Sequence, residues 1–149
     1  MRRFKFTLQS LYNYKLTVEK LQKAELSKAQ QALQLLLNEE ERIQQAQKDT
    51  ELSLELALEK GDNIVAALTE HDAYFRFLRD SLIEVRTRIV RAEEIVRLCQ
   101  EKLIITMREL KAYDRLRDEQ YDAYRLEVQA EDAKMLDDLV SFKVISEEA

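Results

Sequence analysis

Proline and tryptophan are missing from this chain of 149 residues, and Gly61 is its single glycine. An ordinary globular chain of this length carries roughly seven prolines and ten glycines. Sandwiches, barrels and doubly wound sheets need such residues at most of their turns, and a phosphate-binding loop needs several glycines close together. These folds are therefore excluded. Apolar residues make up 46% of the chain, too many for a disordered acidic protein, so we expect an all-α fold.

Residues that carry enzyme chemistry are also scarce. With His71 as the single histidine and Cys99 as the single cysteine, a His-His metal pair, a zinc site and the Glu-x-x-His pairs of di-iron bundles cannot form. Cys99 has no second cysteine for an internal disulfide and no histidine nearby in sequence to activate it. Asp137 and Asp138 are adjacent, so on a helix they point about 100° apart and do not face each other. The sequence predicts a protein that is not an enzyme and needs no metal or cofactor.

Long apolar runs are absent as well. No stretch approaches the roughly 18 residues that span a bilayer. The opening MRRFKFTLQS lacks the apolar run and cleavage site of a signal peptide. We therefore expect a cytoplasmic protein.

The charge of the chain is unevenly distributed. The net charge is −5, and residues 119–149 hold nine acidic and three basic residues. Six arginines lie within residues 76–97, but acidic residues are interleaved with them. Because phosphate tracking requires an uncompensated basic stripe, a solvated helix face with salt bridges is a better interpretation than nucleic-acid binding.

One strong break interrupts the helical pattern, at Lys60-Gly61-Asp62-Asn63. Glycine can end a helix in the left-handed conformation, and Asp62 or Asn63 can cap the next helix. We predict a single domain over residues 1–149, a long antiparallel two-helix coiled-coil hairpin. Its parts are a helix at about 5–59, a turn at 60–63, a helix at about 64–140 and a short frayed acidic tail.

Two ladders of seven-residue spacing follow the break and indicate a left-handed coiled coil. Heptads alone do not distinguish a partner helix in the same chain from one in a second chain, so dimerisation through the ladders is an alternative. The first ladder is apolar at every position, and the second at five of seven. The first consists of Leu68, Phe75, Leu82, Ile89, Val96, Leu103 and Leu110, and the second of His71, Leu78, Val85, Ala92, Cys99, Thr106 and Tyr113.

The apolar stripe before the break is less regular. It includes polar members at Lys15, Gln22 and Thr50, where ideal packing prefers leucine or isoleucine. We therefore expect a weakly held seam. The apolar members are Leu8, Leu11, Val18, Leu26, Ala29, Leu33, Leu36, Ile43, Leu54 and Ala57.

Three segments have a more specific composition. Aromatic and aliphatic residues crowd the opening from Phe4 to Leu16, and a second aromatic segment runs from His71 to Leu82. A charged helix closes with Lys134-Met135-Leu136-Asp137-Asp138-Leu139-Val140-Ser141-Phe142. In this order, and over essentially the whole chain, these segments resemble the flagellar export protein FliJ family. His71 departs from the aromatic residue that is usual at its position in the family.

The resemblance implies a component of the flagellar type III export apparatus that is shaped like the stalk of a rotary ATPase. Such a stalk would stand in the central pore of the hexameric export ATPase, promote its assembly and activity, and link it to the cytoplasmic domain of the export-gate membrane protein. It would be cytoplasmic and peripheral at the cytoplasmic face of the cell membrane. Export chaperones are further partners that the family implies. The alternatives are a virulence type III secretion counterpart, a chaperone-handling protein and a general cytoplasmic coiled-coil adaptor.

Two sets of candidate contact residues follow from the resemblance and from position along the predicted hairpin. For each set the competing interpretation is ordinary packing, because Phe75, Leu78 and Leu82 belong to the ladders and aromatic residues can pack the ends of the hairpin. The expected export-gate contacts are Tyr74, Phe75, Leu78, Ser81 and Leu82. The expected ATPase-ring contacts are Phe4, Phe6, Leu8, Leu11, Tyr14, Tyr121, Tyr124 and Leu136.

Overall fold

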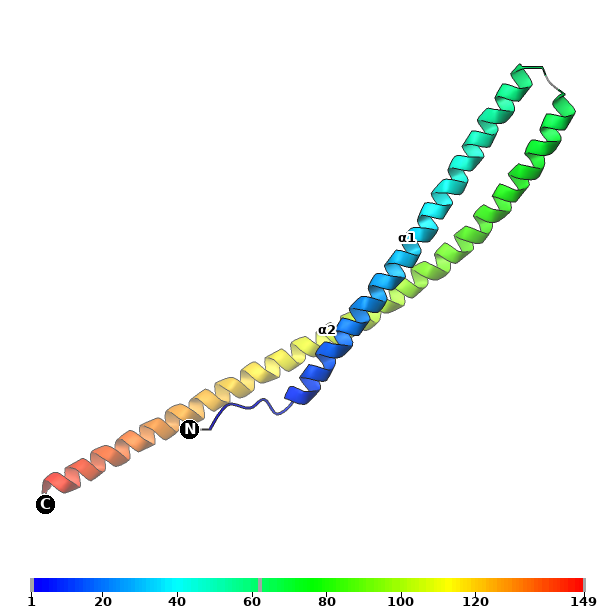
Figure 1. Cartoon of the computed structure of the whole chain (residues 1–149). Helices are drawn as coiled ribbons and strands as arrows, with labels where there is room; N and C mark the ends of the chain where they lie inside the picture. Colours follow the sequence, from blue (N-terminus) through cyan, green and yellow to red (C-terminus); the bar gives the residue numbers. More distant parts are fainter. Residues whose placement is uncertain (1, 62, 149) are drawn as a thin grey trace. The chain divides into compact units, whose positions relative to one another are not determined.

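A computed structural model describes residues 2–61 and 63–148, which form an all-α hairpin (Figure 1). Helix α1 spans Gln9–Glu59 and helix α2 spans Ile64–Glu148. The predicted fold class is thus confirmed. The expected helix ends were wrong in two places, because α1 begins at Gln9 instead of near residue 5 and α2 continues to Glu148. The acidic tail does not fray because it is rich in helix-forming residues and contains no glycine or proline.

The chain divides into two compact units, each of which is described by itself. The turn unit consists of the described residues between Leu21 and Leu103. The terminal unit consists of the described residues up to Lys20 together with those from Ile104 onward. The single domain expected from the sequence stays a prediction.

The break between the helices has the predicted glycine chemistry. Gly61 adopts a φ of 70°, in the left-handed region, and its N–H donates to the carbonyl of Leu58 (3.3 Å). The side chain of Asn63 caps α2 by accepting a hydrogen bond from the N–H of Ala66 (3.4 Å). Asp62, the other expected cap, lies outside the described residues.

The turn unit has a narrow apolar core in which α1 and α2 pack side by side. Figure 1 shows the cyan part of α1 running antiparallel to the green part of α2. Within this unit the partner of the ladders is α1 of the same chain, as the hairpin predicts. Leu68 departs from the pattern, because it is 45% exposed close to the turn. The buried core residues are Ile43, Leu78, Leu82, Val85 and Ile89, with Leu33, Leu36 and Ala46 packed against them.

The polar members of the α1 stripe do lie in the seam. In the turn unit, the buried Thr50 hydroxyl donates to the carbonyl of Ala46 (2.7 Å), and the Gln22 side-chain oxygen is buried without a partner among the described atoms. In the terminal unit, the Lys15 ammonium group pairs with Glu109, which raises the pKa of Lys15. The polar positions are therefore tolerated mainly by local pairing.

One apolar member of the stripe was wrongly placed. Leu11 is 49% exposed, and the neighbouring Tyr12 packs on α2 through Tyr113 instead. The larger aromatic ring thus occupies the seam at the start of α1.

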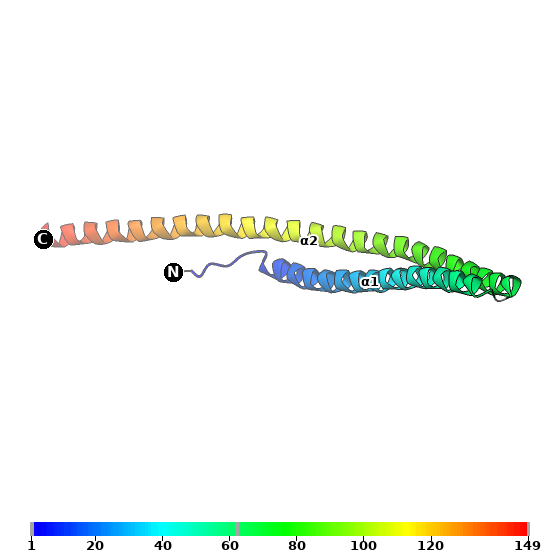
Figure 2. The ribbon, with the colours of Figure 1, turned by 90° about the horizontal axis from the view of Figure 1, so that it is seen from above.

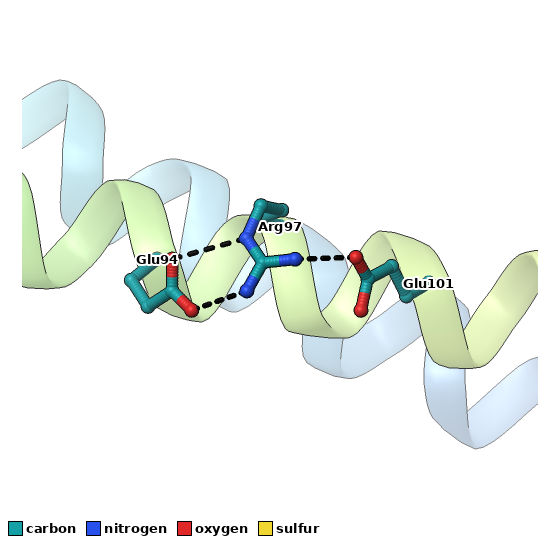
Figure 3. A network of polar contacts seen from close by, with 3 residues as sticks. All are labelled: Glu94, Arg97 and Glu101. Atoms are coloured by element: carbon teal, nitrogen blue, oxygen red, sulfur yellow. Dashed lines mark hydrogen bonds and ion pairs between the residues drawn. The ribbon is translucent and has the colours of Figure 1, made fainter.

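Away from the seam, four arginines of α2 pair with carboxylates one helical turn away, namely Arg76, Arg88, Arg97 and Arg117. Arg97 donates through Nε to Glu94 (3.0 Å) and through Nη1 to Glu101, and all three side chains are about half exposed (Figure 3). The hydrogen bonds with Glu94 raise the pKa of Arg97 and lower the pKa of Glu94. Arg88 pairs with Glu84 in the same way (2.7 Å). This pattern is the solvated, salt-bridged face that the sequence predicted.

Candidate binding surfaces

The chain enters α1 through a non-helical lead-in segment, residues 2–8, which Figure 2 shows as the blue coil before the helix. The ring of Phe4 lies edge-on against Tyr121, with centroids 5.2 Å apart, and 5.6 Å from the ring of Tyr124. The Tyr124 hydroxyl donates to the backbone carbonyl of Arg2. These contacts bring together three of the residues expected to bind the ATPase ring.

Further along the lead-in segment, Phe6 is buried at 8% exposure. Its ring contacts Tyr12 in an edge-on geometry, and Tyr12 contacts Tyr113 in the same way, with centroids 6.5 Å apart in both pairs. The Arg117 guanidinium lies 5.5 Å from the centre of the Tyr12 ring. Phe6 is therefore an anchor of the terminal unit in this structure.

An ionic contact completes this aromatic cluster. Arg117 pairs with Asp114 at 3.4 Å. A hydrogen bond with the Asp114 carboxylate, assisted by burial, raises the pKa of Tyr12. Sequence reasoning did not select Tyr12 or Arg117 as site residues, although the aromatic opening and the place of Tyr113 on the second ladder were signals for this contact.

The eight expected ring contacts fall into two groups by exposure. Leu11, Tyr14, Tyr121 and Leu136 are exposed, between 45% and 63%. Phe4, Leu8 and Tyr124 are half-buried and Phe6 is buried, because they pack the terminal unit itself. Leu11, Tyr14 and Leu136 are free to meet a partner while the lead-in segment stays in place, whereas the Tyr121 ring packs against Phe4.

The C-terminal segment, residues 129–148, is the most exposed part of the terminal unit. Every residue in it is exposed, although it is helical to its end. Met135, Leu139 and Phe142 follow one another at spacings of four and three, so they share one side of the helix. The exposed large apolar residues of the segment are Met135, Leu136, Leu139, Val140, Phe142, Val144 and Ile145.

The expected export-gate contacts are also divided by burial. Leu78 and Leu82 are part of the core of the turn unit, and Phe75 and Ser81 are half-buried beside it. Tyr74 is 45% exposed and stacks on Phe77, with ring centroids 6.2 Å apart and planes 23° apart. The exposed aromatic pair is therefore Tyr74 with Phe77, and Phe77 was not among the expected contacts.

A shallow groove of about 430 Å³ lies beside Tyr74, between α1 and α2 of the turn unit. His71 lies in this groove and is half-buried. Its Nδ1 is 2.7 Å from the carbonyl of Ala67, so Nδ1 carries the proton and donates it. The groove is where polar side chains interrupt the seam, and it is lined by Ala46, Asp49, Thr50, Ser53, Glu70, His71 and Tyr74.

In residues 2–61 and 63–148, no three side chains of His, Cys, Asp or Glu are placed to hold a metal ion. In those ranges, neither α1 nor α2 contains a stretch long and apolar enough to cross a bilayer.

Comparison with known proteins gives one match. A family model, described as the flagellar FliJ protein, matches residues 4–149. No curated protein and no solved structure matches the chain.

Proposed function

The chain belongs to the flagellar FliJ family and is thus a component of the flagellar export apparatus, and we propose that it acts as the non-enzymatic stalk of that apparatus. In this role its terminal unit binds in the central pore of the hexameric export ATPase and promotes assembly and activity of the ring. Its turn unit binds the cytoplasmic domain of the export-gate membrane protein. The protein is then held at the cytoplasmic face of the membrane through these partners.

The observation that carries this proposal is the exposed apolar side of the C-terminal segment. Seven large apolar side chains are exposed along this helical segment, and Met135, Leu139 and Phe142 share one side of it. Contiguous apolar surface of this kind marks an interaction site in soluble proteins. A helix end that exposes large apolar residues suits insertion into a pore, because several subunits can contact it at once.

A stalk of this kind acts on the ring without any catalytic group. A six-fold ring cannot match a two-helix stalk symmetrically, so each subunit meets a different side of it. Subunits that bind one side better than another are shifted toward different conformations. Differential contact thereby favours the assembled, asymmetric ring and its turnover.

Leu139→Asp tests the ring contact directly. The variant places a carboxylate on the apolar side of the C-terminal segment and should reduce stimulation of ATPase activity about tenfold or more, since a buried contact of this kind often contributes more than 1 kcal/mol. Ala130→Asp is the matched control. Ala130 lies two and a half turns before Leu139 and thus on the opposite side of the helix, so stimulation should be retained.

Two results would contradict the stalk proposal. One is equal stimulation by wild type and Leu139→Asp when circular dichroism shows both to be folded. The other is the absence of a bound stalk in electron micrographs of ATPase rings assembled with the wild-type protein.

The gate contact is best supported at Tyr74 and Ser81. Tyr74 offers an exposed ring, and Ser81 lies seven residues later on the same side of α2. Leu78 and Leu82 lie in the core, so they support this surface from below while the hairpin is closed. Phe75 is half-buried, so it is neither as exposed as Tyr74 nor part of the core.

Tyr74→Ala and Ser81→Glu should therefore weaken binding to the gate domain and leave ATPase stimulation unchanged. Isothermal titration with the purified gate domain measures the first effect. Ile83→Ala, which removes an exposed apolar side chain elsewhere on α2, is the control and should bind like wild type. If both variants bind the gate domain as tightly as wild type, the site lies elsewhere.

A further inference from the structure

The lead-in segment is attached to α2 by a small set of contacts. Phe4 packs on two tyrosine rings, the carbonyl of Arg2 accepts one hydrogen bond, and the Thr7 hydroxyl pairs with the Gln120 amide (3.2 Å). The side chains of Arg2, Arg3 and Lys5 are exposed. The segment thus binds α2 through contacts of the kind that a separate peptide would make.

Burial of the lead-in segment decreases toward the chain end. Phe6 is buried against Tyr12, whereas Phe4 is only half-buried. The Gln9 N–H donates to the carbonyl of Phe6 (3.1 Å), which fixes the point where the segment joins α1. Release of residues 2–5 therefore leaves the Phe6 anchor and both helices intact, and the conformational entropy gained by the freed residues favours it.

The surface under Phe4 consists of Tyr121 and Tyr124, two of the residues expected to contact the ATPase ring. Tyr124 is half-buried in the presence of the segment, and Tyr121 retains 45% exposure. A ring of Tyr121 or Tyr124 that packs against Phe4 cannot offer that same face to another protein. Phe4 and an outside partner therefore compete for one site.

We propose that the lead-in segment is a displaceable cover: residues 2–5 occupy a docking site on α2 formed by Tyr121 and Tyr124, and a partner gains this site when they are released. The functional part of this inference rests on the proposed function, because the partner is the ATPase ring. The apparent affinity for the ring is then lowered by the fraction of molecules in which the cover is closed. A substitution that loosens the cover strengthens ring binding.

Phe4 and Tyr121 touch each other, but their substitutions should have opposite effects on ring binding. Phe4→Ala removes the ring that covers the site and should lower the half-saturating concentration for ATPase stimulation about threefold or more. Tyr121→Ala removes part of the site itself and should raise that concentration. If Phe4 were a direct ring contact, both substitutions would weaken binding.

The closed cover is tested by proteolysis of the full-length protein without any partner. Tryptic cleavage after Arg3 and Lys5, followed by mass spectrometry, should be about threefold faster or more in Phe4→Ala than in wild type. Tyr124→Phe keeps the ring but loses the hydrogen bond to the Arg2 carbonyl, so it should also speed cleavage. Phe142→Ala, which removes an exposed aromatic ring from the C-terminal segment, is the control and should cleave like wild type.

Each outcome decides one of the two claims. Unchanged cleavage in both Phe4→Ala and Tyr124→Phe would overturn the cover. Faster cleavage together with weaker ATPase stimulation by Phe4→Ala would show that Phe4 contacts the ring and would overturn its role as a competitor. If wild type itself fails to stimulate the ATPase, the proposed function fails, and the cleavage comparison still decides whether the segment is a releasable cover.

Discussion

Two stretches of α2 carry apolar residues at spacings of four and three, Leu78-Leu82-Val85 and Met135-Leu139-Phe142, and the two differ in burial. In residues 78–92 the apolar side is covered by α1, and Leu78 is only 4% exposed. In the C-terminal segment the apolar side is uncovered, and Leu139 is 63% exposed. Apolar spacing therefore decides which side of a helix seeks a partner, but it does not decide whether the partner belongs to the same chain. The seven exposed apolar residues there are the basis of the proposal that this segment binds another molecule.

The difference in burial between the two stretches is tested most directly by shortening one leucine in each of them. Leu78→Ala should lower the free energy of unfolding by about 2 to 4 kcal/mol, because it leaves a cavity in the core of the turn unit. Leu139→Ala should change it by no more than about 0.5 kcal/mol. Urea unfolding followed by circular dichroism measures both. Similar losses would mean that the C-terminal segment is covered in the free protein.

The packing of α1 on residues 78–92 of α2 depends on the turn that brings α1 back along α2. Gly61→Ala should lower the stability of the hairpin by about 1 kcal/mol, because alanine is strained at a positive φ. A Cβ at this position meets no atom within 4 Å, so the loss is conformational and not steric. Glu59→Ala, in the last turn of α1, is the control. An unchanged melting temperature for Gly61→Ala would show that the turn tolerates another conformation.

A smaller effect should appear at high pH in the terminal unit. The hydrogen bond between Tyr12 and the Asp114 carboxylate favours the neutral form of Tyr12. The folded-state pKa of Tyr12 therefore lies above its ordinary value of 10.0. The resulting stabilisation is complete below about pH 10 and is lost as the pH rises through the folded-state pKa. Stability measured from pH 8 to 11.5 should fall more steeply in wild type than in Tyr12→Phe. Parallel curves would remove this hydrogen bond from the account.

The smallest effect is expected on the solvated face of α2, where ion pairs form within one helix and need no contact with α1 or another molecule. Arg97→Ala should reduce the melting temperature slightly at low ionic strength and hardly at all in 0.5 M salt (roughly the range in which surface pairs are screened). Arg88→Ala should behave alike because Arg88 has a comparable pairing. A large loss that persists in high salt would indicate that Arg97 packs in the seam.

Much of the fold was predictable because its local signals agree. Gly61 and Asn63 supply the chemistry of the break, and the ladders supply the buried side of α2. Leu11 misled the prediction, because spacing alone could not show that Tyr12 would fill the seam next to Tyr113. The start of α1 was also predicted too early, because the side chains of the lead-in segment pack on α2 while its backbone is not helical.

The candidate sites were predictable only as regions. The aromatic opening, the segment around Tyr74 and the charged end near Leu136 all stood out in the sequence. Sequence reasoning could not divide them into covered and exposed residues. That division depends on which rings meet across the helices, as Phe4 meets Tyr121 and Tyr74 meets Phe77.

By itself, the sequence determined that the chain is helical, where the turn between the two helices lies and which side of α2 is apolar, because these follow from backbone preferences and residue spacing. Only the tertiary structure decided that Phe4 closes over Tyr121 and Tyr124, that Leu78 is core and that the C-terminal segment has no cover. Burial is a property of pairs of surfaces. A sequence specifies one surface at a time, and the packing of residues far apart in the chain decides which surface is left for a partner.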